Sequence, residues 1–520
     1  MEIKQNMSKK IRQALISVSD KSNLKLILKT LLKYDIKILS SGGTSREIKK
    51  MGYDCKEISS FTKSPEILEG RVKTLHPKIY AGILNKRNNK KHKRELKSHN
   101  YEEIDLIIVN FYPFEKIIEK TKSIKKIIEN IDIGGPALVR AAAKNYNDVA
   151  VITNTNQYQN LITELKKNKG STSIDFRKEL SEEAFALTAY YDSVISNYFN
   201  NKSKKKFPKK KIIYGNLIET VRYGENPHQK AAIYSTKYNP EISQIYGKKL
   251  SYNNYNDIFS ALNLSKTFPK NIGTVIVKHS NPCGASVNNN KVDSFKEAYA
   301  CDPISAFGGI VSCNFKVTIK VANEINKLFL EVIIGNGFEK NAIKILKRKK
   351  NLRIIDSSKI KLANKNNLTN NFNSFLIQSP DNKIFKKNNF KIVSKKKPNR
   401  KTLENLIFSF NVCRSVKSNA IVLSKEKATI GIGSGQPSRL DSCKIAIEKM
   451  NKFQTINANE EIIAASDAFF PFVDGIETLV QAGISAVIQP SGSIRDKEII
   501  KFADKVGIIL VFSNTRHFKH

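Results

Sequence analysis

The sequence contains no tryptophan, only six cysteines and no apolar run that approaches the length of a membrane-spanning helix. The cysteines are scattered along the chain: Cys55, Cys283, Cys301, Cys313, Cys413 and Cys443. Because none of them forms a C-x-x-C pair, the pattern predicts neither a zinc knuckle nor a disulfide framework. The first ten residues lack the apolar core of a signal peptide. We therefore expect a cytoplasmic protein with reduced thiols and no membrane partner.

Acidic residues are also scarce, since 47 Asp and Glu face 89 Lys and Arg and leave a net charge of +42. Such an excess can indicate nucleic-acid binding. However, the sequence shows no zinc finger, helix-turn-helix or RNA-binding aromatic signature, and its lysines cluster in polar connecting segments. We therefore interpret the charge as compositional bias on an enzyme surface and expect no specific nucleic-acid partner. A basic nucleic-acid-binding protein with vestigial enzyme motifs is the alternative.

The N-terminal part of the chain alternates strand and helix signals. Apolar, β-branched runs at 14–18, 36–40, 105–110 and 149–153 predict strands, and amphipathic stretches between them predict helices. This alternation is typical of a parallel α/β domain. Apolar residues at helical spacing over 185–199 predict a long helix after the last strand.

A lysine-rich segment at 201–213 then predicts an exposed linker. A chain of 520 residues exceeds what one hydrophobic core usually supports, so at least two domains are expected. We place them at 11–200 and 214–520.

The second domain mixes strands and helices again. Strands are predicted at 274–278, 420–423, 486–489 and 508–512. The Asn- and Lys-rich stretch 347–401 has the weakest structural signals and divides this domain into two halves. No short internal repeat is visible.

The segment Lys278-His279-Ser280-Asn281-Pro282-Cys283-Gly284 follows an apolar run at 274–277. Its Pro and Gly predict that regular structure stops there, which would present Lys278 and His279 at a strand end, a common place for substrate sites in α/β sheets. A histidine can act as a base near neutral pH, and a lysine can stabilise developing negative charge. For an isolated Lys-His pair, a strand end that happens to carry two polar residues is the preferred interpretation.

Ser41-Gly42-Gly43-Thr44, at a predicted strand-to-helix turn, suits a phosphate because the glycines permit close approach and the helix supplies free N–H groups. The segment 17–22 follows the first strand in the same way, and Arg71 and Lys73 add positive charge. Together they predict a phosphorylated ligand above the strand ends.

Asp132 and Lys144 flank a Gly-Gly turn and an Ala-rich helix. A carboxylate and an ammonium group could exchange protons with a substrate there. A capped helix with one exposed lysine is the structural alternative.

A series of segments, in this order, resembles the bifunctional family in which AICAR transformylase is fused to IMP cyclohydrolase. The segments are SVSDKS, SSGGTS, EGRVKTLHP, VNFYPF, IDIGGPALVRAAAKN, VRYGENPHQ, KHSNPCG, CDPISAFGGIVS, GIGSGQPSR, SDAFFPF, QPSGSIRD and RHFKH. The resemblance extends from about residue 11 to residue 520, so both Met1 and Met7 remain open as the start.

The resemblance implies two activities at the end of purine synthesis. The C-terminal domain would transfer a formyl group from 10-formyltetrahydrofolate to the amino group of AICAR, and the N-terminal domain would close the product FAICAR to IMP with loss of water. The implied fold is a methylglyoxal-synthase-like parallel α/β domain followed by two cytidine-deaminase-like α/β subdomains. A homodimer would build the transformylase sites at its interface.

The resemblance also implies roles for individual residues. Lys278 and His279 would catalyse formyl transfer. Four residues would surround the reacting groups in cyclisation: Lys73, Tyr112, Asp132 and Lys144. The N-terminal substrate contacts would be Ser17, Asp20, Lys21, Ser41, Gly42, Gly43, Thr44, Arg71, Thr74 and Asn110. The C-terminal contacts would be Arg222, Tyr223, Asn419, Arg439, Phe469, Asp474, Arg516 and His520.

A deaminase-like fold raises zinc chemistry as an alternative. A zinc deaminase needs His-x-Glu followed by Pro-Cys-x-x-Cys. Here Ser280 and Asn281 follow His279, and Pro282-Cys283 has no second cysteine two residues further on. We therefore expect no catalytic metal, and ribotides and folate as the small-molecule partners.

Overall fold

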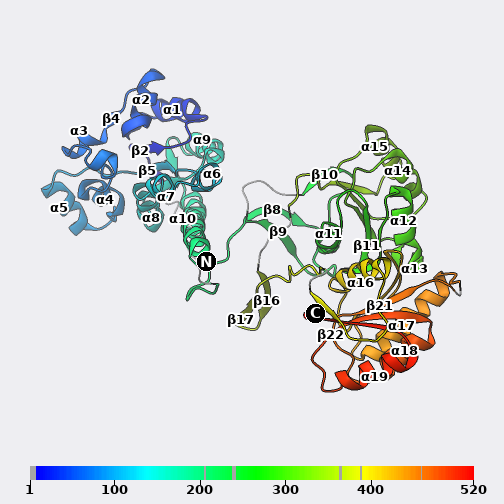
Figure 1. The fold of residues 1–520 in the computed structure, drawn as a ribbon. Helices are drawn as coiled ribbons and strands as arrows, with labels where there is room; N and C mark the ends of the chain where they lie inside the picture. Colours follow the sequence, from blue (N-terminus) through cyan, green and yellow to red (C-terminus); the bar gives the residue numbers. More distant parts are fainter. Residues whose placement is uncertain (1–7, 204–205, 237–241, 362–365, 387–388, 458) are drawn as a thin grey trace. The chain divides into compact units, whose positions relative to one another are not determined.

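The computed structural model describes residues 8–203, 206–236, 242–361, 366–386, 389–457 and 459–520 (Figure 1). The two candidate start residues and positions 204–205 of the predicted linker lie outside these ranges. The chain divides into two compact units, Met1–Asn216 and Leu217–His520, which are described separately. No helix in the described ranges is both long and apolar enough to cross a membrane.

The N-terminal unit is built on a five-stranded sheet in the order β4-β3-β2-β5-β6. All its pairings are parallel. Its strands are β2 (Gln13–Val18), β3 (Lys37–Ser40), β4 (Lys56–Glu57), β5 (Leu106–Asn110) and β6 (Ala150–Ile152). The strands predicted at 14–18, 36–40, 105–110 and 149–153 are therefore confirmed within two residues at each end.

Helices and one short strand pair complete this unit. The helices are α1 (Leu24–Lys33), α2 (Gly42–Lys50), α3 (Ile58–Thr62), α4 (Pro77–Leu84), α5 (Lys90–Ser98), α6 (Phe114–Lys120), α7 (Ile124–Glu129), α8 (Gly134–Lys144), α9 (Tyr158–Lys167) and α10 (Ile174–Lys202), with 3-10 turns at Leu68–Gly70 and Thr155–Gln157. Strand β1 (Lys9–Lys10) pairs with β7 (Ser171–Thr172). The helix predicted at 185–199 is the C-terminal part of α10.

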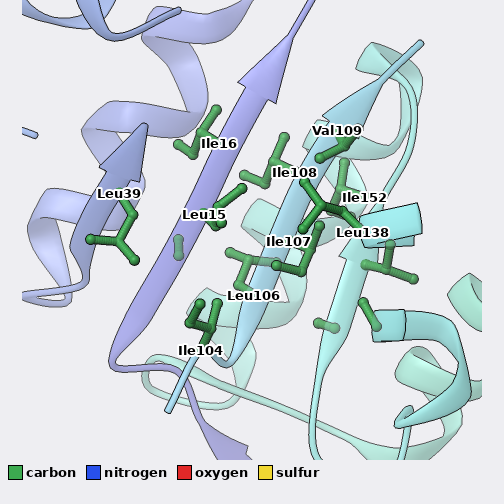
Figure 2. Packing of buried hydrophobic residues seen from close by; sticks show 14 of the residues in the cluster. Leu15, Ile16, Leu39, Ile104, Leu106, Ile107, Ile108, Val109, Leu138 and Ile152 are labelled. Atoms are coloured by element: carbon green, nitrogen blue, oxygen red, sulfur yellow. The ribbon is translucent and has the colours of Figure 1, made fainter. Parts of the chain in front are cut away.

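The core of this unit lies around the central strands, whose side chains are buried on both faces of the sheet. Leu15 of β2 and Ile107 of β5 are fully buried, and Leu138 of α8, a helix that packs against β5, belongs to the same buried cluster (Figure 2). Burial on both faces is the normal state of a parallel sheet and explains why these strands read as continuous apolar runs. Polar side chains therefore gather beyond the ends of the strands.

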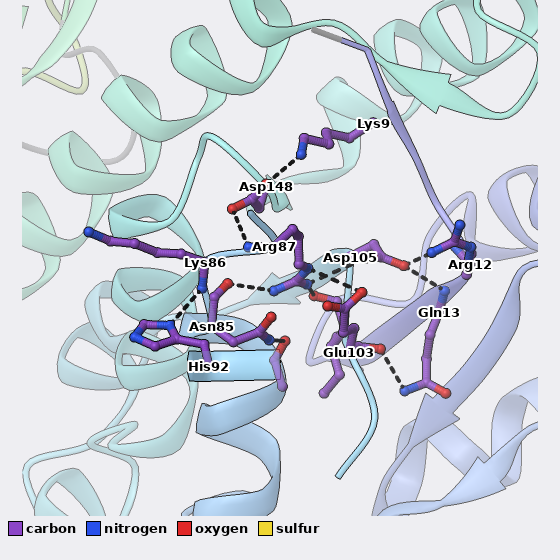
Figure 3. Close-up of polar contacts among 12 residues, drawn as sticks. Lys9, Arg12, Gln13, Asn85, Lys86, Arg87, His92, Glu103, Asp105 and Asp148 are labelled. Atoms are coloured by element: carbon purple, nitrogen blue, oxygen red, sulfur yellow. Dashed lines mark hydrogen bonds and ion pairs between the residues drawn. The ribbon is translucent and has the colours of Figure 1, made fainter. Parts of the chain in front are cut away.

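A buried polar network fixes the amino ends of the strands (Figure 3). The Arg87 guanidinium donates to the carbonyls of Asn85 and Ile104, both at 2.8 Å, and lies 3.4 Å from Asp105 Oδ1. Asp105 Oδ2 accepts the N–H of Arg12 at 2.9 Å. Because both buried charges have partners, the network holds the starts of β2 and β5 together. It lies at the edge of the sheet opposite to the polar loops.

The C-terminal unit contains a twelve-stranded sheet in the order β10-β15-β14-β13-β11-β12-β20-β19-β21-β22-β23-β18. Its strands are β10 (Ser243–Tyr246), β11 (Gly273–Lys278), β12 (Asn281–Val287), β13 (Ile310–Cys313), β14 (Val332–Gly335), β15 (Arg353–Asp356), β18 (Phe390–Ile392), β19 (Ile421–Lys425), β20 (Ala428–Gly433), β21 (Ile462–Ser466), β22 (Ile484–Pro490) and β23 (Ile509–Ser513). Two further pairs are β8 (Asn216–Val221) with β9 (Ala231–Ser235), and β16 (Asn367–Asn371) with β17 (Ser374–Gln378). The helices are α11 (Tyr252–Ser265), α12 (Lys291–Ala300), α13 (Pro303–Ala306), α14 (Ile319–Asn326), α15 (Lys340–Leu346), α16 (Arg400–Cys413), α17 (Arg439–Phe453), α18 (Asp474–Gln481) and α19 (Asp496–Val506).

The large sheet consists of two halves with the same topology. In the first half β11 pairs antiparallel with β12 and β13, and β13, β14 and β15 continue in parallel. In the second half β19 pairs antiparallel with β20 and β21, and β21, β22 and β23 continue in parallel. The halves join where β12 meets β20 at Ser286 and Ala428. The two halves repeat the same order and direction of strands without repeating a short sequence motif, so no short repeat was visible in the sequence.

Two local predictions for this unit were wrong. Regular structure does not stop after the Lys-His pair, because Asn281 to Gly284 form the start of β12, with a register shift opposite Val277. A Cβ on Gly284 would lie 1.9 Å from the Ala298 carbonyl, so this glycine permits close helix packing rather than a turn. The stretch 347–401 is also more regular than expected, since it contains β15, β16, β17 and β18.

Candidate active sites

The N-terminal unit has a cavity of about 580 Å³ beyond the carboxyl ends of β2, β3 and β5. Ligands commonly bind at this edge of parallel sheets because the loops there converge. Most of the predicted N-terminal site residues line it: Ser17, Lys21, Ser41, Gly43, Thr44, Arg71, Lys73, Thr74, Asn110, Tyr112 and Asp132. The fold therefore brings together segments that are far apart in the sequence.

One part of this cavity suits an anion. Ser41 stands at the N-terminus of α2, and its buried hydroxyl has no hydrogen-bond partner among the residues described. Lys73 Nζ lies 3.3 Å from the place where a side chain on Gly42 would begin, and Gly42 has a φ of 50°. A free hydroxyl, a helix N-terminus and a lysine thus converge, which is the arrangement that binds phosphate in many proteins.

Asp132 and Tyr112 form the other part of the cavity. Asp132 Oδ1 accepts the N–H of Gly135 in the first turn of α8 at 2.8 Å. Burial raises the pKa of Asp132 above 3.8, although the N–H groups of Gly135 and Tyr112 and the charge of Lys73 oppose this rise. Burial also raises the pKa of Tyr112, and the negative charge of Asp132 adds to the effect. A carboxyl group with a raised pKa is suited to exchanging protons with a ligand.

Three predicted residues do not line this cavity. Gly42 is half-buried beside the cavity lining, and Asp20 is exposed, with its main chain held by the side chain of Asn110. Lys144 is exposed at the C-terminal end of α8, about 15 Å along the helix from the cavity at its N-terminus. Its catalytic role stays a prediction.

Arg71 has an acidic partner that no sequence motif indicates. The guanidinium forms an ion pair with the carboxylate of Glu129, whose side chain also lines the cavity. Arg71 and Glu129 are 58 residues apart, and no local pattern connects them. Arg71 was expected to attract the ligand phosphate, but its positive charge is already balanced by the carboxylate of Glu129.

The C-terminal unit has a larger cavity of about 860 Å³. Four predicted residues line it: Lys278, His279, Arg222 and Tyr223. The Lys278 ammonium donates to the Phe307 carbonyl at 2.7 Å, which fixes the lysine on the cavity wall. The sequence analysis did not single out Lys248, Lys249 or Arg353, which line the same cavity and add positive charge.

The other predicted C-terminal residues lie outside this cavity, and two of them, Arg439 and Phe469, are linked to each other and to Asp467. Asn419, Arg439, Phe469, Asp474, Arg516 and His520 are not among the residues that line the cavity. Arg439 donates to the fully buried Asp467 at 2.6 Å and to the Phe469 carbonyl at 3.3 Å. One protomer therefore does not enclose all the predicted residues in one cavity.

The C-terminal segment connects this group to the Lys-His turn. Lys519 Nζ donates to the carbonyls of Ser415 at 2.8 Å and of Ser280 at 3.3 Å. Burial lowers the pKa of Lys519 to about 8, and the nearby charge of Lys417 contributes. The N–H of Lys417 donates to the Asn281 side chain at 2.9 Å. The end of the chain is thus a structural part of the site.

Two cavities in two α/β units, each lined by cationic and proton-exchanging side chains, are typical of a two-site enzyme that acts on anionic small molecules. A family model described as the AICARFT/IMPCHase bienzyme matches residues 142–449, and a model of the MGS-like domain matches residues 24–137. The N-terminal unit is therefore MGS-like, as the resemblance implied.

Relatives match over almost the whole chain. The bifunctional purine biosynthesis protein PurH of Bradyrhizobium diazoefficiens is 43% identical over 98% of this chain and 99% of its own length. The PurH proteins of Persephonella marina and Prochlorococcus marinus are 44% and 45% identical, each over 98% of this chain and over 100% and 99% of their own lengths. A solved structure described as "Crystal structure of ForH" is 29% identical over 36% of this chain and 99% of its own, with a TM-score of 0.34, which supports no structural argument.

The chain therefore belongs to the bifunctional AICARFT/IMPCHase family. It is an enzyme of purine biosynthesis that formylates AICAR to FAICAR and closes FAICAR to IMP. The first activity requires a folate co-substrate. The function predicted from the sequence is confirmed, and a nucleic-acid-binding protein is not favoured.

The buried carboxyl group of Asp132 should lower the stability of the N-terminal unit at neutral pH. Because its pKa is raised in the folded state, the stability that its proton contributes is present below about pH 3.8 and is lost as the pH rises through the folded-state pKa. Asp132→Asn keeps an acceptor for the Gly135 N–H without the charge. We expect its unfolding temperature at pH 7 to exceed that of the wild type by about 2 °C or more.

Differential scanning calorimetry between pH 4 and pH 8 measures this difference. The advantage of Asp132→Asn should shrink as the pH falls, because the wild-type carboxyl group then becomes neutral. Asp175→Asn, at the exposed start of α10, is the control and should show no comparable pH-dependent gain. A variant that is less stable than the wild type at every pH would contradict the role of burial.

Proposed function

We propose that formyl transfer takes place in the 860 Å³ cavity, with His279 as the base and Lys278 as the cation that meets the developing negative charge. The amine of AICAR is a poor nucleophile because its lone pair is delocalised into the imidazole, so it needs a base as it attacks. The observation that carries this proposal is that His279 and Lys278 line the same cavity from one hairpin.

The proposed formyl donor is 10-formyltetrahydrofolate. Lys278 would stabilise the oxyanion formed on the formyl group or protonate the folate nitrogen as it leaves. Three cationic side chains support an anionic ribotide and a folate carboxylate in this cavity: Arg222, Lys248 and Lys249. A fourth, Arg353, lies 3.6 Å from the carboxylate of Glu331, which also lines the cavity. We propose that the reaction uses no catalytic metal. Among the described residues no group of three or more His, Cys, Asp or Glu side chains is arranged to hold a metal ion.

His279→Ala should lower the kcat of formyl transfer at least 100-fold, because a positioned base contributes about that factor or more. The measurement is a folate-dependent assay with AICAR and 10-formyltetrahydrofolate, without added metal. His99→Ala, which removes an exposed histidine of the N-terminal unit, is the matched control and should retain full activity. Formyl transfer near the wild-type rate by His279→Ala would overturn the assignment.

We propose that cyclisation takes place in the 580 Å³ cavity. Ser41, Gly43, Thr44 and Lys21 would hold the phosphate of FAICAR at the start of α2. The reaction joins two groups of one molecule, so correct positioning supplies much of the acceleration.

Lys73, Tyr112 and Asp132 would surround the reacting groups and move protons between them. The presence of a half-buried carboxyl group and a lysine on the wall of the same cavity supports this role. Lys144 remains part of the proposal, although its own protomer places it outside the cavity lining.

The two activities are proposed to reside in independently folding domains. The fragment to test is 1–216 rather than 1–200, because Tyr214 packs on Tyr190 and the side chain of Asn216 donates to the Tyr190 hydroxyl at 2.7 Å. We expect this fragment to cyclise FAICAR with a kcat within about threefold of the full chain, since the residues that line the cavity all lie inside it. A soluble, folded fragment that fails to make IMP would count against independent domains.

We also propose a cytoplasmic homodimer. The six cysteines are free and five are buried, as expected for a reducing compartment. Six predicted residues lie outside the His279 cavity of one protomer, which a dimeric site would explain: Asn419, Arg439, Phe469, Asp474, Arg516 and His520. The hairpin β16–β17 also exposes the apolar side chains of Leu368, Phe372, Phe375 and Leu376.

Sedimentation equilibrium should give a mass of about twice 58.7 kDa. If each transformylase site combines residues from two protomers, mixing inactive His279→Ala with inactive Arg516→Ala should restore up to about one quarter of the wild-type activity, because half of the dimers are then mixed and each mixed dimer has one intact site out of two. A monomer with full formyl transfer activity would contradict the proposal. Mixed variants that stay inactive would place each site within one protomer.

A further inference from the structure

The proposed catalytic hairpin closes through an unusual turn. Only His279 and Ser280 lie between β11 and β12, and their φ angles are 53° and 61°. Two-residue hairpin turns with positive φ at both positions favour Asn and Gly, because other side chains are strained there. A histidine in this place needs compensation from its surroundings.

The Asp257 side chain supplies that compensation. Asp257 lies on α11, and each of its carboxylate oxygens accepts one N–H of the turn. Oδ1 accepts from Ser280 at 2.6 Å and Oδ2 from His279 at 3.1 Å. The Ser280 hydroxyl lies a further 3.4 Å from Oδ1. In the described part of the chain Asp257 forms no ion pair, so the turn provides its polar partners.

The second half of the sheet contains the same turn with a neutral acceptor. Glu426 and Lys427, with φ angles of 49° and 62°, join β19 to β20. Asn405 occupies the sixth position of α16, as Asp257 does in α11, and its Oδ1 accepts the Lys427 N–H at 3.1 Å. An amide therefore suffices to support this hairpin. In the first half the Asp257 carboxylate accepts two N–H groups of the turn, whereas in the second half the Asn405 amide accepts one.

The opposite side of the His279–Ser280 turn is also held. The Ser280 carbonyl accepts from the buried Lys519 ammonium at 3.3 Å. Asn281, the first residue after the turn, accepts from the Lys417 N–H at 2.9 Å. With these contacts on one side and Asp257 on the other, the main chain of His279 has little freedom to rotate. Because His279 is exposed, its ring direction depends on its main chain rather than on packing.

We propose that Asp257 is a positioning residue for formyl transfer, which holds His279 in the orientation that its reaction requires. This inference rests on the proposed role of His279 as the base. A misplacement of about 1 Å can cost a factor of about 100 in rate, so two charge-assisted hydrogen bonds to the turn are sufficient for a large kinetic effect. Asp257 also lines the cavity, but in this proposal it acts through His279 and not through contact with the reacting atoms.

The first test is Asp257→Asn, which keeps the size of the side chain and leaves one acceptor for two N–H groups. We expect kcat for formyl transfer to fall at least tenfold, with KM for AICAR and folate changing less than threefold. The kcat for FAICAR cyclisation should stay unchanged, which shows that equal amounts of enzyme are compared, while the calorimetric unfolding transition of the C-terminal unit reports on the fold around Asp257. Asn405→Ala is the matched control, expected to lower stability but not kcat. An unchanged kcat in Asp257→Asn would overturn the proposal.

Two further variants separate positioning from other roles. Ser280→Gly relieves strain at positive φ, so in the Asp257→Asn background it should restore kcat at least threefold. In a His279→Ala background, Asp257→Asn should lower the residual single-turnover rate less than twofold, because a residue that acts through His279 has nothing left to position.

A full tenfold loss in that His279→Ala background, or no rescue by Ser280→Gly, would show that Asp257 acts by another route. If His279→Ala alone keeps the wild-type rate, the proposed base is wrong. That outcome is distinct from a failure of Asp257→Asn to lower kcat.

Discussion

The C-terminal site depends on a turn that must keep two non-glycine residues at positive φ. Glycine would relax the main chain there, but it would remove the imidazole that faces the cavity. The protein keeps the histidine and stabilises its conformation with the carboxylate of Asp257. The local conformational cost is thus met by contacts from a distant helix, as is common for functional residues in sparsely populated regions of φ and ψ.

The same type of turn occurs in both halves of the large sheet but has a different role in each. Both halves of the large sheet use a hairpin turn at positive φ with a helix side chain beneath it. In the second half the turn residues form surface ion pairs, Glu426 with Lys401 and Lys427 with Glu404. In the first half they are His279 and Ser280 beside a cavity. Function therefore resides in the side chains placed on the repeated scaffold and not in the scaffold itself.

The N-terminal unit separates stability from chemistry along its strands. At the amino ends the paired charges of Arg87 and Asp105 and continuous apolar packing hold the sheet together. At the carboxyl ends helix N-termini, lysines and a partly desolvated Asp132 surround the cavity. Partial burial of Asp132 lowers the stability of the folded unit but yields a carboxyl group able to exchange protons. The paired charges and apolar packing at the opposite edge of the sheet offset this loss of stability.

The sequence by itself determined four of the five strands of the N-terminal sheet, and β11, β19, β22 and β23 of the twelve-stranded sheet, because burial on both faces leaves continuous apolar runs in the chain. It also identified the Lys278–His279 pair, whose neighbours form a specific motif. Only the tertiary structure decided which partners these residues meet. Glu129 beside Arg71 and Asp257 beneath His279 are contacts between segments that no local periodicity connects. The sequence also did not indicate that β12 runs through Pro282, because Pro and Gly are local turn signals. In the structure this segment is a strand because it pairs with β11 and because α12 packs closely on Gly284.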